Sequence, residues 1–195
     1  MEIATELIKK LRDKTGVSVM QCKKALEEAG GDIEKAIMIL QKKSASIAEK
    51  KADRTLGSGV VEAYIHANHA VGTMVELLCE TDFVANNDEF RKLARDIAMH
   101  VTATSPQFVK KDDIDSHSKK MAEEMFEKEV HGKPKDIKEK ILEGKLSAYW
   151  GERVLLDQAF IKNPEMTINN LIQSAIQKFG EKIEVGRFSR FAVRT

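Results

Sequence analysis

Residues 60–79, VVEAYIHANHAVGTMVELLC, decide the fold class because their hydrophobic period is two. The first run alternates up to Ile65, and a second alternates from Val71 to Cys79. A short polar turn, residues 67–70, separates the two runs. Two alternating runs around a short polar turn are typical of an antiparallel β-hairpin. We therefore predict a hairpin, which other elements must extend into a sheet.

Residues 1–52, before this hairpin, have a helical period instead. Their apolar positions form three stripes: Ile3, Leu7, Ile8 and Leu11; Val19, Cys22, Leu26 and Ala29; Ile33, Ala36, Ile37 and Leu40. Gly16 and Gly30-Gly31 suit the left-handed ends of helices, and Ser18 and Asp32 suit N-caps. Ser18 and Gln21 also fit a capping box. We predict a three-helix module with a polar helical linker over 1–52, and a second domain over 53–195.

Helices and strands alternate irregularly after the hairpin. A helix is predicted with Phe90, Leu93, Ala94, Ile97, Ala98 and Val101 on one face, ending before Ser105-Pro106. Next come a strand-like run over 154–161, a turn at Asn163-Pro164, a helix over 168–179 and a last strand over 183–193. One hairpin plus this last strand makes a small antiparallel sheet backed by helices, so the predicted fold class is α+β.

Residues 115–148 are the most charged stretch of the chain. Two narrow apolar stripes run through it: Met121, Met125 and Phe126, then Ile137, Ile141 and Leu142. Gly132-Lys133-Pro134 lies between them, and proline is tolerated only in the first turn of a helix. We predict a projecting antiparallel helical hairpin whose only core is the seam between its two helices.

Composition excludes several classes of protein. The chain has 195 residues, 32 Lys plus Arg and 31 Asp plus Glu, for a net charge of +1. This balance argues against a nucleic-acid binder that relies on phosphate neutralisation. No run of 18 apolar residues exists and the N-terminus lacks an apolar signal region, so we expect no membrane span and a cytoplasmic protein. Two distant cysteines fit a reducing compartment.

Signatures of enzymes are absent from the sequence. It has no GxxxxGK[ST] phosphate loop, GxGxxG, GxSxG, HExxH or CxxC motif. His66 and His69 form an HxxH at the hairpin turn, and Cys79 could lie nearby, but a metal site needs three or four converging ligands. Cys22 lies on an apolar stripe and fits a buried structural thiol. We expect no enzyme activity, no catalytic residue, no metal and no cofactor.

The segment Glu80-Thr81-Asp82-Phe83-Val84-Ala85-Asn86-Asn87 places an aromatic beside an acid at a strand-to-helix break. In one interpretation Thr81 or Asp82 is an ordinary N-cap and Phe83 anchors the turn to the core. In the other, Phe83 projects towards a partner protein, since aromatic side chains are common interface anchors. The residues alone leave both interpretations open.

Three segments together resemble the bacterial elongation factor Ts family, the guanine-nucleotide exchange factors of elongation factor Tu. They are LRDKTGVSVMQCKKALEEAGGDIEKAI (11–37), ETDFVANNDEF (80–90), and the ordered run from IAMHVTATSPQFV through GKPKDIKEKILEGKL to LLDQAFIKNPEMTI (97–168). The resemblance covers essentially the whole chain. It implies a ubiquitin-associated-like fold for the N-terminal module. Only one core half is found where the longer family members carry two, which implies a short form that works as a homodimer.

The resemblance also implies site residues. Thr81, Asp82, Phe83 and Val84 correspond to the family's TDFV segment, which disturbs the Mg²⁺ site of elongation factor Tu. Further partner contacts carried over from the family are Val19, Met20 and Lys23 of the module, His66 of the hairpin, and Ile161 and Lys162. The family's QPFV motif reads Gln158-Ala159-Phe160-Ile161, with Ala for Pro. An alternative function is a non-catalytic adaptor that recruits a protein through the three-helix module.

Overall fold

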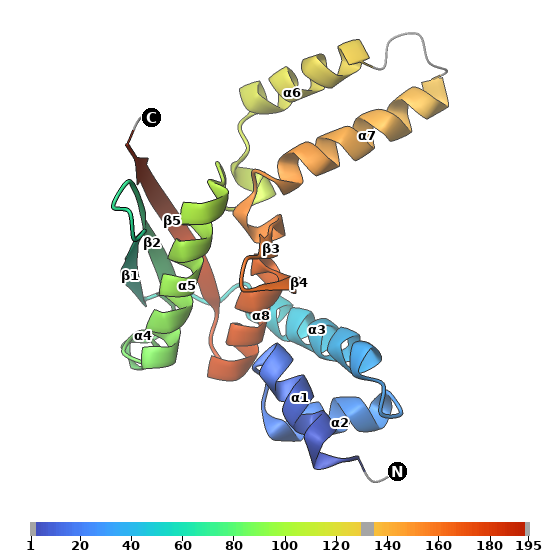
Figure 1. The fold of residues 1–195 in the computed structure, drawn as a ribbon, viewed down its shortest axis with the longest axis vertical. Coiled ribbons are helices and arrows are strands. Elements are labelled where there is room, and N and C mark those ends of the chain that lie inside the picture. Colours follow the sequence, from blue (N-terminus) through green and yellow to red (C-terminus); the bar gives the residue numbers. More distant parts are fainter. Residues whose placement is uncertain (1–2, 130–134, 194–195) are drawn as a thin grey trace. The chain divides into compact units, whose positions relative to one another are not determined.

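The computed structural model describes residues 3–129 and 135–193 (Figure 1). Two short 3₁₀ segments, Lys111–Asp113 and Leu155–Asp157, accompany the helices and strands. The helices are α1 (Thr5–Thr15), α2 (Val19–Glu28), α3 (Ile33–Glu49), α4 (Asp82–Ala85), α5 (Asp88–Thr104), α6 (Ser116–Glu129), α7 (Lys135–Gly151) and α8 (Ile168–Phe179). The strands are β1 (Ser58–Ile65), β2 (Val71–Cys79), β3 (Ala159–Phe160), β4 (Asn163–Thr167) and β5 (Ile183–Ala192). The predicted α+β fold is confirmed.

The main sheet has the strand order β1-β2-β5, so the predicted hairpin forms and the last strand joins it beside β2. Alternate residues of β2 from Thr73 to Cys79 are buried on one face, as the period of two predicts. The hydroxyl oxygens of Thr73 and Thr102 lie 2.9 Å apart, which ties β2 to helix α5. The central strand therefore has a partner on each side and a helix against its buried face.

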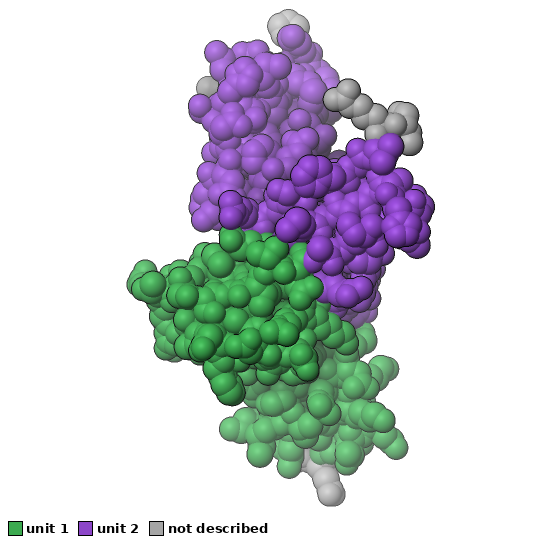
Figure 2. Space-filling view, turned by 90° about the vertical axis from the view of Figure 1, so that its left-hand side faces the viewer, with its two compact units in different colours: residues 1–62, 76–94, 169–186 green, residues 63–75, 95–168, 187–195 purple. Residues whose placement is uncertain are grey.

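The chain divides into two compact units (Figure 2). The first comprises residues 1–62, 76–94 and 169–186, and the second comprises 63–75, 95–168 and 187–195. The predicted boundary after residue 52, between the three-helix module and the second domain, stays a prediction.

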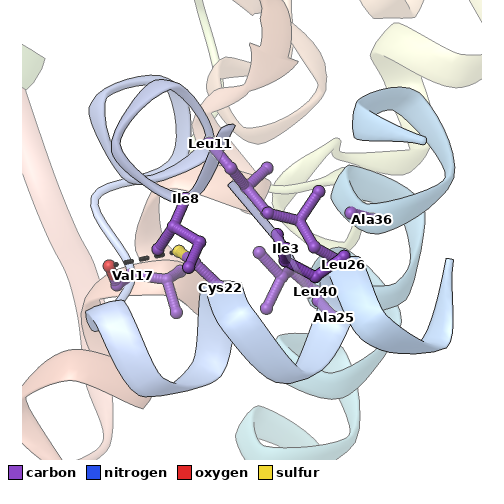
Figure 3. Close-up of a cluster of buried hydrophobic side chains, with 9 residues drawn as sticks. All are labelled: Ile3, Ile8, Leu11, Val17, Cys22, Ala25, Leu26, Ala36 and Leu40. Carbon is purple, nitrogen blue, oxygen red and sulfur yellow. Dashed lines mark hydrogen bonds between the residues drawn. The ribbon is translucent and has the colours of Figure 1, made fainter. Parts of the chain in front are cut away.

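Helices α1–α3 enclose a hydrophobic cluster that includes Leu11, Cys22 and Leu26 (Figure 3). The thiol of Cys22 donates to the backbone oxygen of Val17 at 3.5 Å, and burial raises the pKa of this thiol. Val17 is buried in the cluster, whereas Val19 is 52% exposed. The predicted stripe was wrong at Val19, because α2 begins at that residue and Val17, before the helix, supplies the apolar contact instead.

The predicted helix ends are confirmed in this module. Gly16 ends α1 with φ of 68°, a left-handed conformation that suits glycine. The Ser18 side chain accepts the N–H of Gln21 at 3.4 Å, and Asp32 accepts the N–H of Lys35 at 3.1 Å. The Ser18 hydroxyl also donates to the Gln21 side-chain oxygen at 3.1 Å, so this pair interacts side chain to side chain as well.

Helices α6 and α7 form the predicted hairpin, and its expected turn at 132–134 lies outside the described residues. The stripe predicted on α6 was wrong at two of its three positions, since Met121 and Met125 are exposed. Ala122 is the buried residue of α6, and the Phe126 ring meets the Tyr149 ring edge-on at 5.5 Å. The α6 side of the seam is therefore formed by Ala122 and Phe126.

The predicted strand over 154–161 was also wrong in length. Only Ala159–Phe160 form a strand, β3, which pairs with β4 in a separate antiparallel ladder, so Asn163-Pro164 begin a strand where a turn was predicted. The N–H of Leu155 donates to the backbone oxygen of Phe108 at 2.9 Å. The start of the predicted strand is thus hydrogen-bonded to the segment around Phe108, and residues Leu155–Asp157 then form a 3₁₀ turn.

A buried polar network joins α5 to β3 in the second unit. His100 is fully buried, and its Nε2 lies 2.9 Å from Oε1 of Gln158. The N–H of Ile161 donates to Nδ1 of His100 at 3.3 Å, so the imidazole carries its proton on Nε2. Gln158 Nε2 in turn donates to the backbone oxygen of Glu152 at 2.6 Å. Burial lowers the pKa of His100, which keeps the imidazole neutral.

This lowered pKa predicts a pH dependence of stability. Below about pH 6.5 the unfolded chain binds a proton at His100 that the folded protein binds only at lower pH, so the free energy of unfolding should fall as the pH drops from about 6.5 through the folded pKa. Denaturant unfolding between pH 8 and 5 measures this slope. We expect H100Q to lose the His100 contribution to it and H117Q, at an exposed position, to retain it. An unchanged slope in H100Q would contradict the prediction.

Candidate functional site

Thr81 to Ala85 form a turn between β2 and α5, in the first unit. Strand β2 ends at Cys79, whose thiol donates to the backbone oxygen of Thr81 at 3.2 Å. Burial raises the pKa of this thiol, and the nearby Glu181 raises it further. The single helical turn α4 follows directly. Thr81 holds the N-cap position that one interpretation gave it, but its side chain makes no capping hydrogen bond to the helix.

The side chains of this turn divide sharply between core and solvent. Phe83 is 83% exposed, whereas Val84 is 4% exposed and Ala85 is also buried. Successive helical residues point about 100° apart, so a turn that buries residues 84 and 85 directs residue 83 outward. The interpretation in which Phe83 anchors the turn to the core was therefore wrong. Thr81 and Asp82 are exposed beside it.

The carboxylate of Glu181 holds the start of this turn. Its Oε2 accepts the N–H groups of Glu80 and Thr81, both at 3.1 Å, and its Oε1 accepts the Thr81 hydroxyl at 2.5 Å. Hydrogen bonds to a charged acceptor are about twice as strong as those between neutral groups. The sequence analysis missed Glu181, which lies 100 residues from Thr81 along the chain.

The carboxylate of Glu80 in turn accepts a hydrogen bond from the residue after Glu181. The same carboxylate accepts the N–H of Lys182 at 2.5 Å and a guanidinium nitrogen of Arg54 at 3.2 Å. The Lys182 hydrogen bond, followed by Arg54, lowers the pKa of Glu80. Two pairs of adjacent residues are thus joined by reciprocal hydrogen bonds: Glu181 accepts from Glu80 and Thr81, and Glu80 accepts from Lys182. We call these four residues the acid clamp.

The segment after α3 contacts the same place. Lys51 Nζ donates to the backbone oxygen of Gly180 at 2.6 Å, and Lys182 Nζ donates to that of Ala52 at 2.6 Å. With Arg54 on Glu80, three stretches of the first unit meet around the acid clamp. The polar linker predicted from the sequence is therefore anchored at its C-terminal end.

The other predicted site residues lie apart from this turn in sequence. On α2, Val19, Met20 and Lys23 are all exposed, with Met20 at 65%. In the second unit, His66 is exposed and its Nδ1 lies 3.2 Å from the Tyr64 hydroxyl.

Ile161 and Lys162, also in the second unit, are exposed as well. Lys162 Nζ pairs with Asp96 at 2.7 Å. The structure brings together Thr81, Asp82, Phe83 and Val84. The remaining predicted contacts are surface residues on α2, after β1, and between β3 and β4.

The HxxH turn gathers no further ligands. Cys79 ends β2, whereas His66 pairs with Val71 at its beginning. Among residues 3–129 and 135–193, no three His, Cys, Asp or Glu side chains gather closely enough to hold a metal ion. Nor does any helix within the described ranges combine the length and apolar character needed to cross a bilayer.

Comparison with known sequences decides the family. Residues 2–195 match the sequence profile of the family described as Elongation factor TS. The chain belongs to the elongation factor Ts family. Its function is therefore that of a nucleotide exchange factor in translation elongation, as the resemblance of its motifs implied.

Several relatives cover the chain almost completely. Elongation factor Ts of Thermodesulfovibrio yellowstonii is 48% identical over 194 residues, which are 99% of this chain and 97% of that protein. Elongation factor Ts of Thermosipho melanesiensis is 46% identical over 193 residues, 98% of each chain. Elongation factor Ts of Carboxydothermus hydrogenoformans is 46% identical over 191 residues, 97% of this chain and 88% of that protein.

The contrast in exposure between two adjacent residues predicts effects of different size on stability. F83A should change the free energy of unfolding by no more than about 0.5 kcal/mol, because an exposed side chain contributes little to folding. V84A should cost roughly 2 kcal/mol, since it removes buried methyl groups and leaves a cavity. Thermal and denaturant unfolding of the two variants measure both changes. A loss of about 3 kcal/mol in F83A, the cost of a buried phenylalanine, would restore the core interpretation.

Proposed function

We propose that this chain promotes release of GDP from elongation factor Tu, and that Phe83 is the side chain that disturbs the GTPase. The observation that carries the proposal is the exposure of Phe83, at 83%, on a turn whose next two residues are buried. A large apolar side chain exposed on an anchored turn has the form of an interface anchor. An adaptor that bound only through the three-helix module would give this turn no role.

The mechanism requires no covalent chemistry. In a GTPase, the backbone of a phosphate loop, a lysine and Mg²⁺ hold the nucleotide. An exchange factor binds the nucleotide-free GTPase more tightly than the loaded one, and linkage then makes factor and nucleotide weaken each other equally. We therefore place this protein among binding proteins of the cytoplasm, with elongation factor Tu as its partner and no cofactor, nucleic acid or membrane of its own.

Each residue of the turn has a part in this proposal. Phe83 inserts near the Mg²⁺ site of the GTPase and shifts the elements that hold the metal. Asp82, exposed next to it, brings a carboxylate into the surroundings of the metal. Thr81 fixes the start of the turn through its two hydrogen bonds to Glu181. Val84, which is buried, fixes the other end to the core.

A second contact surface is proposed on α2. Val19 and Met20 leave apolar side chains in solvent, and Lys23 adds a positive charge one turn along the same helix. This combination suits a partner helix with an apolar stripe and acidic neighbours. His66, Ile161 and Lys162 are proposed as peripheral contacts because each is exposed.

Nucleotide release tests the proposal directly. We expect F83A to lower the stimulated rate of fluorescent GDP release from elongation factor Tu by about tenfold or more, which corresponds to about 1.4 kcal/mol of lost coupling. The wild-type rate in F83A, with the protein folded, would exclude the proposed role. M121A, at an exposed apolar position on α6, is a control for loss of exposed apolar surface in general.

We also propose that the protein acts as a homodimer. The support lies in the second unit, where Ile65, Met74, Phe191 and Val193 are exposed large apolar residues. Ile65, Phe191 and Val193 line a mainly apolar hollow of about 360 Å³ between the hairpin turn and the end of β5. Contiguous exposed apolar surface of this kind marks interaction sites.

Light scattering at micromolar concentration measures the oligomeric state. The wild type should have twice the mass of the chain, and F191D should dissociate to monomers because it buries an unpaired charge in the proposed interface. M121D, at an exposed position on α6, should remain dimeric. A monomeric wild type, both alone and with elongation factor Tu present, would refute the dimer.

A further inference from the structure

We infer that Glu181 is a positioning residue for nucleotide exchange: its carboxylate fixes the turn that presents Phe83. This inference rests on the proposed function. Glu181 follows helix α8, and its carboxylate accepts hydrogen bonds from Glu80 and Thr81 at the start of the turn. It acts only through the backbone and hydroxyl that begin the turn.

The turn needs an external support because it is too short to hold itself. Helix α4 has four residues, which is a single turn, and an isolated turn of helix is unstable in water. Its N-cap residue, Thr81, makes no side-chain bond to the helix. The turn is supported at one end by the burial of Val84 and Ala85. At the other end it is supported by the Cys79 thiol, which donates to the backbone oxygen of Thr81, and by the three hydrogen bonds from Glu80 and Thr81 to Glu181.

Both ends are needed to fix the direction of Phe83. Burial of residues 84 and 85 fixes which side of the turn faces the core. The hydrogen bonds to Glu181 fix the backbone at the start of the turn. They thereby fix the direction in which the Phe83 side chain points. Without them the exposed phenylalanine would sample several directions, and ordering it against the GTPase would consume part of the binding energy. This loss of binding energy would weaken the coupling between factor and nucleotide, even though every contact to the partner would remain.

Glu181 itself is held in place by its neighbours. Gly180 before it adopts a left-handed conformation with φ of 74°, and its backbone oxygen accepts Lys51. The N–H of Lys182 after it donates to the carboxylate of Glu80. A side chain whose backbone is bonded on both sides starts from a restricted position, so its carboxylate is pre-organised for the N–H groups that it accepts.

Glu181 variants test this inference against a purely structural role. We expect E181A to lower the maximal rate of GDP release from elongation factor Tu by about fivefold to tenfold, the effect of losing charge-assisted hydrogen bonds. E181Q, which keeps an acceptor oxygen, should retain an intermediate rate. K178A removes the 2.7 Å ion pair with Glu89 in the same unit and leaves the turn untouched, so it should keep the wild-type rate.

The double variant F83A/E181A separates positioning from general destabilisation. If Glu181 acts through Phe83, the double variant should release GDP at the F83A rate, with no further loss. A structural role would make the two losses multiply, and that result would overturn the inference. A wild-type rate in E181A alongside an impaired F83A would overturn it as well.

Hydrogen exchange distinguishes failure of the inference from failure of the proposed function. The amide of Thr81 should exchange at least about tenfold faster in E181A than in the wild type or K178A, because it loses its acceptor. If F83A leaves GDP release unchanged, the proposed function fails, whatever the amide shows. If the Thr81 amide stays protected in E181A, Glu181 does not hold the turn and the inference fails on its own.

Discussion

The alternation of buried and exposed residues along β2 constrains the rest of this structure. Thr73, Val75, Leu77 and Cys79 all face the helices, so the strand cannot shift by one residue without exposing the whole set. Its neighbours β1 and β5 take the hydrogen bonds on its two edges. Because the last buried position is Cys79, the chain leaves the sheet at a fixed point, and the turn with Phe83 begins there.

Much of this arrangement could be predicted from local sequence. Period-two runs gave the hairpin, and glycines with polar caps gave the ends of α1 and α2 within one residue. The segment around Phe83 stood out because it places an aromatic beside an acid. In each case the signal lies within a few residues of the feature that it predicts, so no knowledge of tertiary contacts is needed.

The remaining features depend on contacts between distant residues. Glu181 meets Thr81 across 100 positions, and nothing near Glu181 marks it as a partner. On α6, Ala122 is buried whereas Met121 and Met125 are exposed, and the Phe126 ring meets the Tyr149 ring of α7. The core or surface position of Phe83 was decided by the burial of Val84 and Ala85. Periodicity predicts which residues share a face, whereas tertiary packing selects the face that is buried.

The exposure of Phe83 has a consequence for how this protein can evolve. Mutations usually lower cellular abundance by destabilising the fold, and selection removes them through that loss. Substitution of a side chain that is 83% exposed has little effect on the stability of the fold, so this kind of selection does not act on it. A substitution at this position should therefore change the interaction with a partner while protein levels stay constant. Variation at the adjacent Val84 is restricted by folding in every lineage, whatever the partner requires.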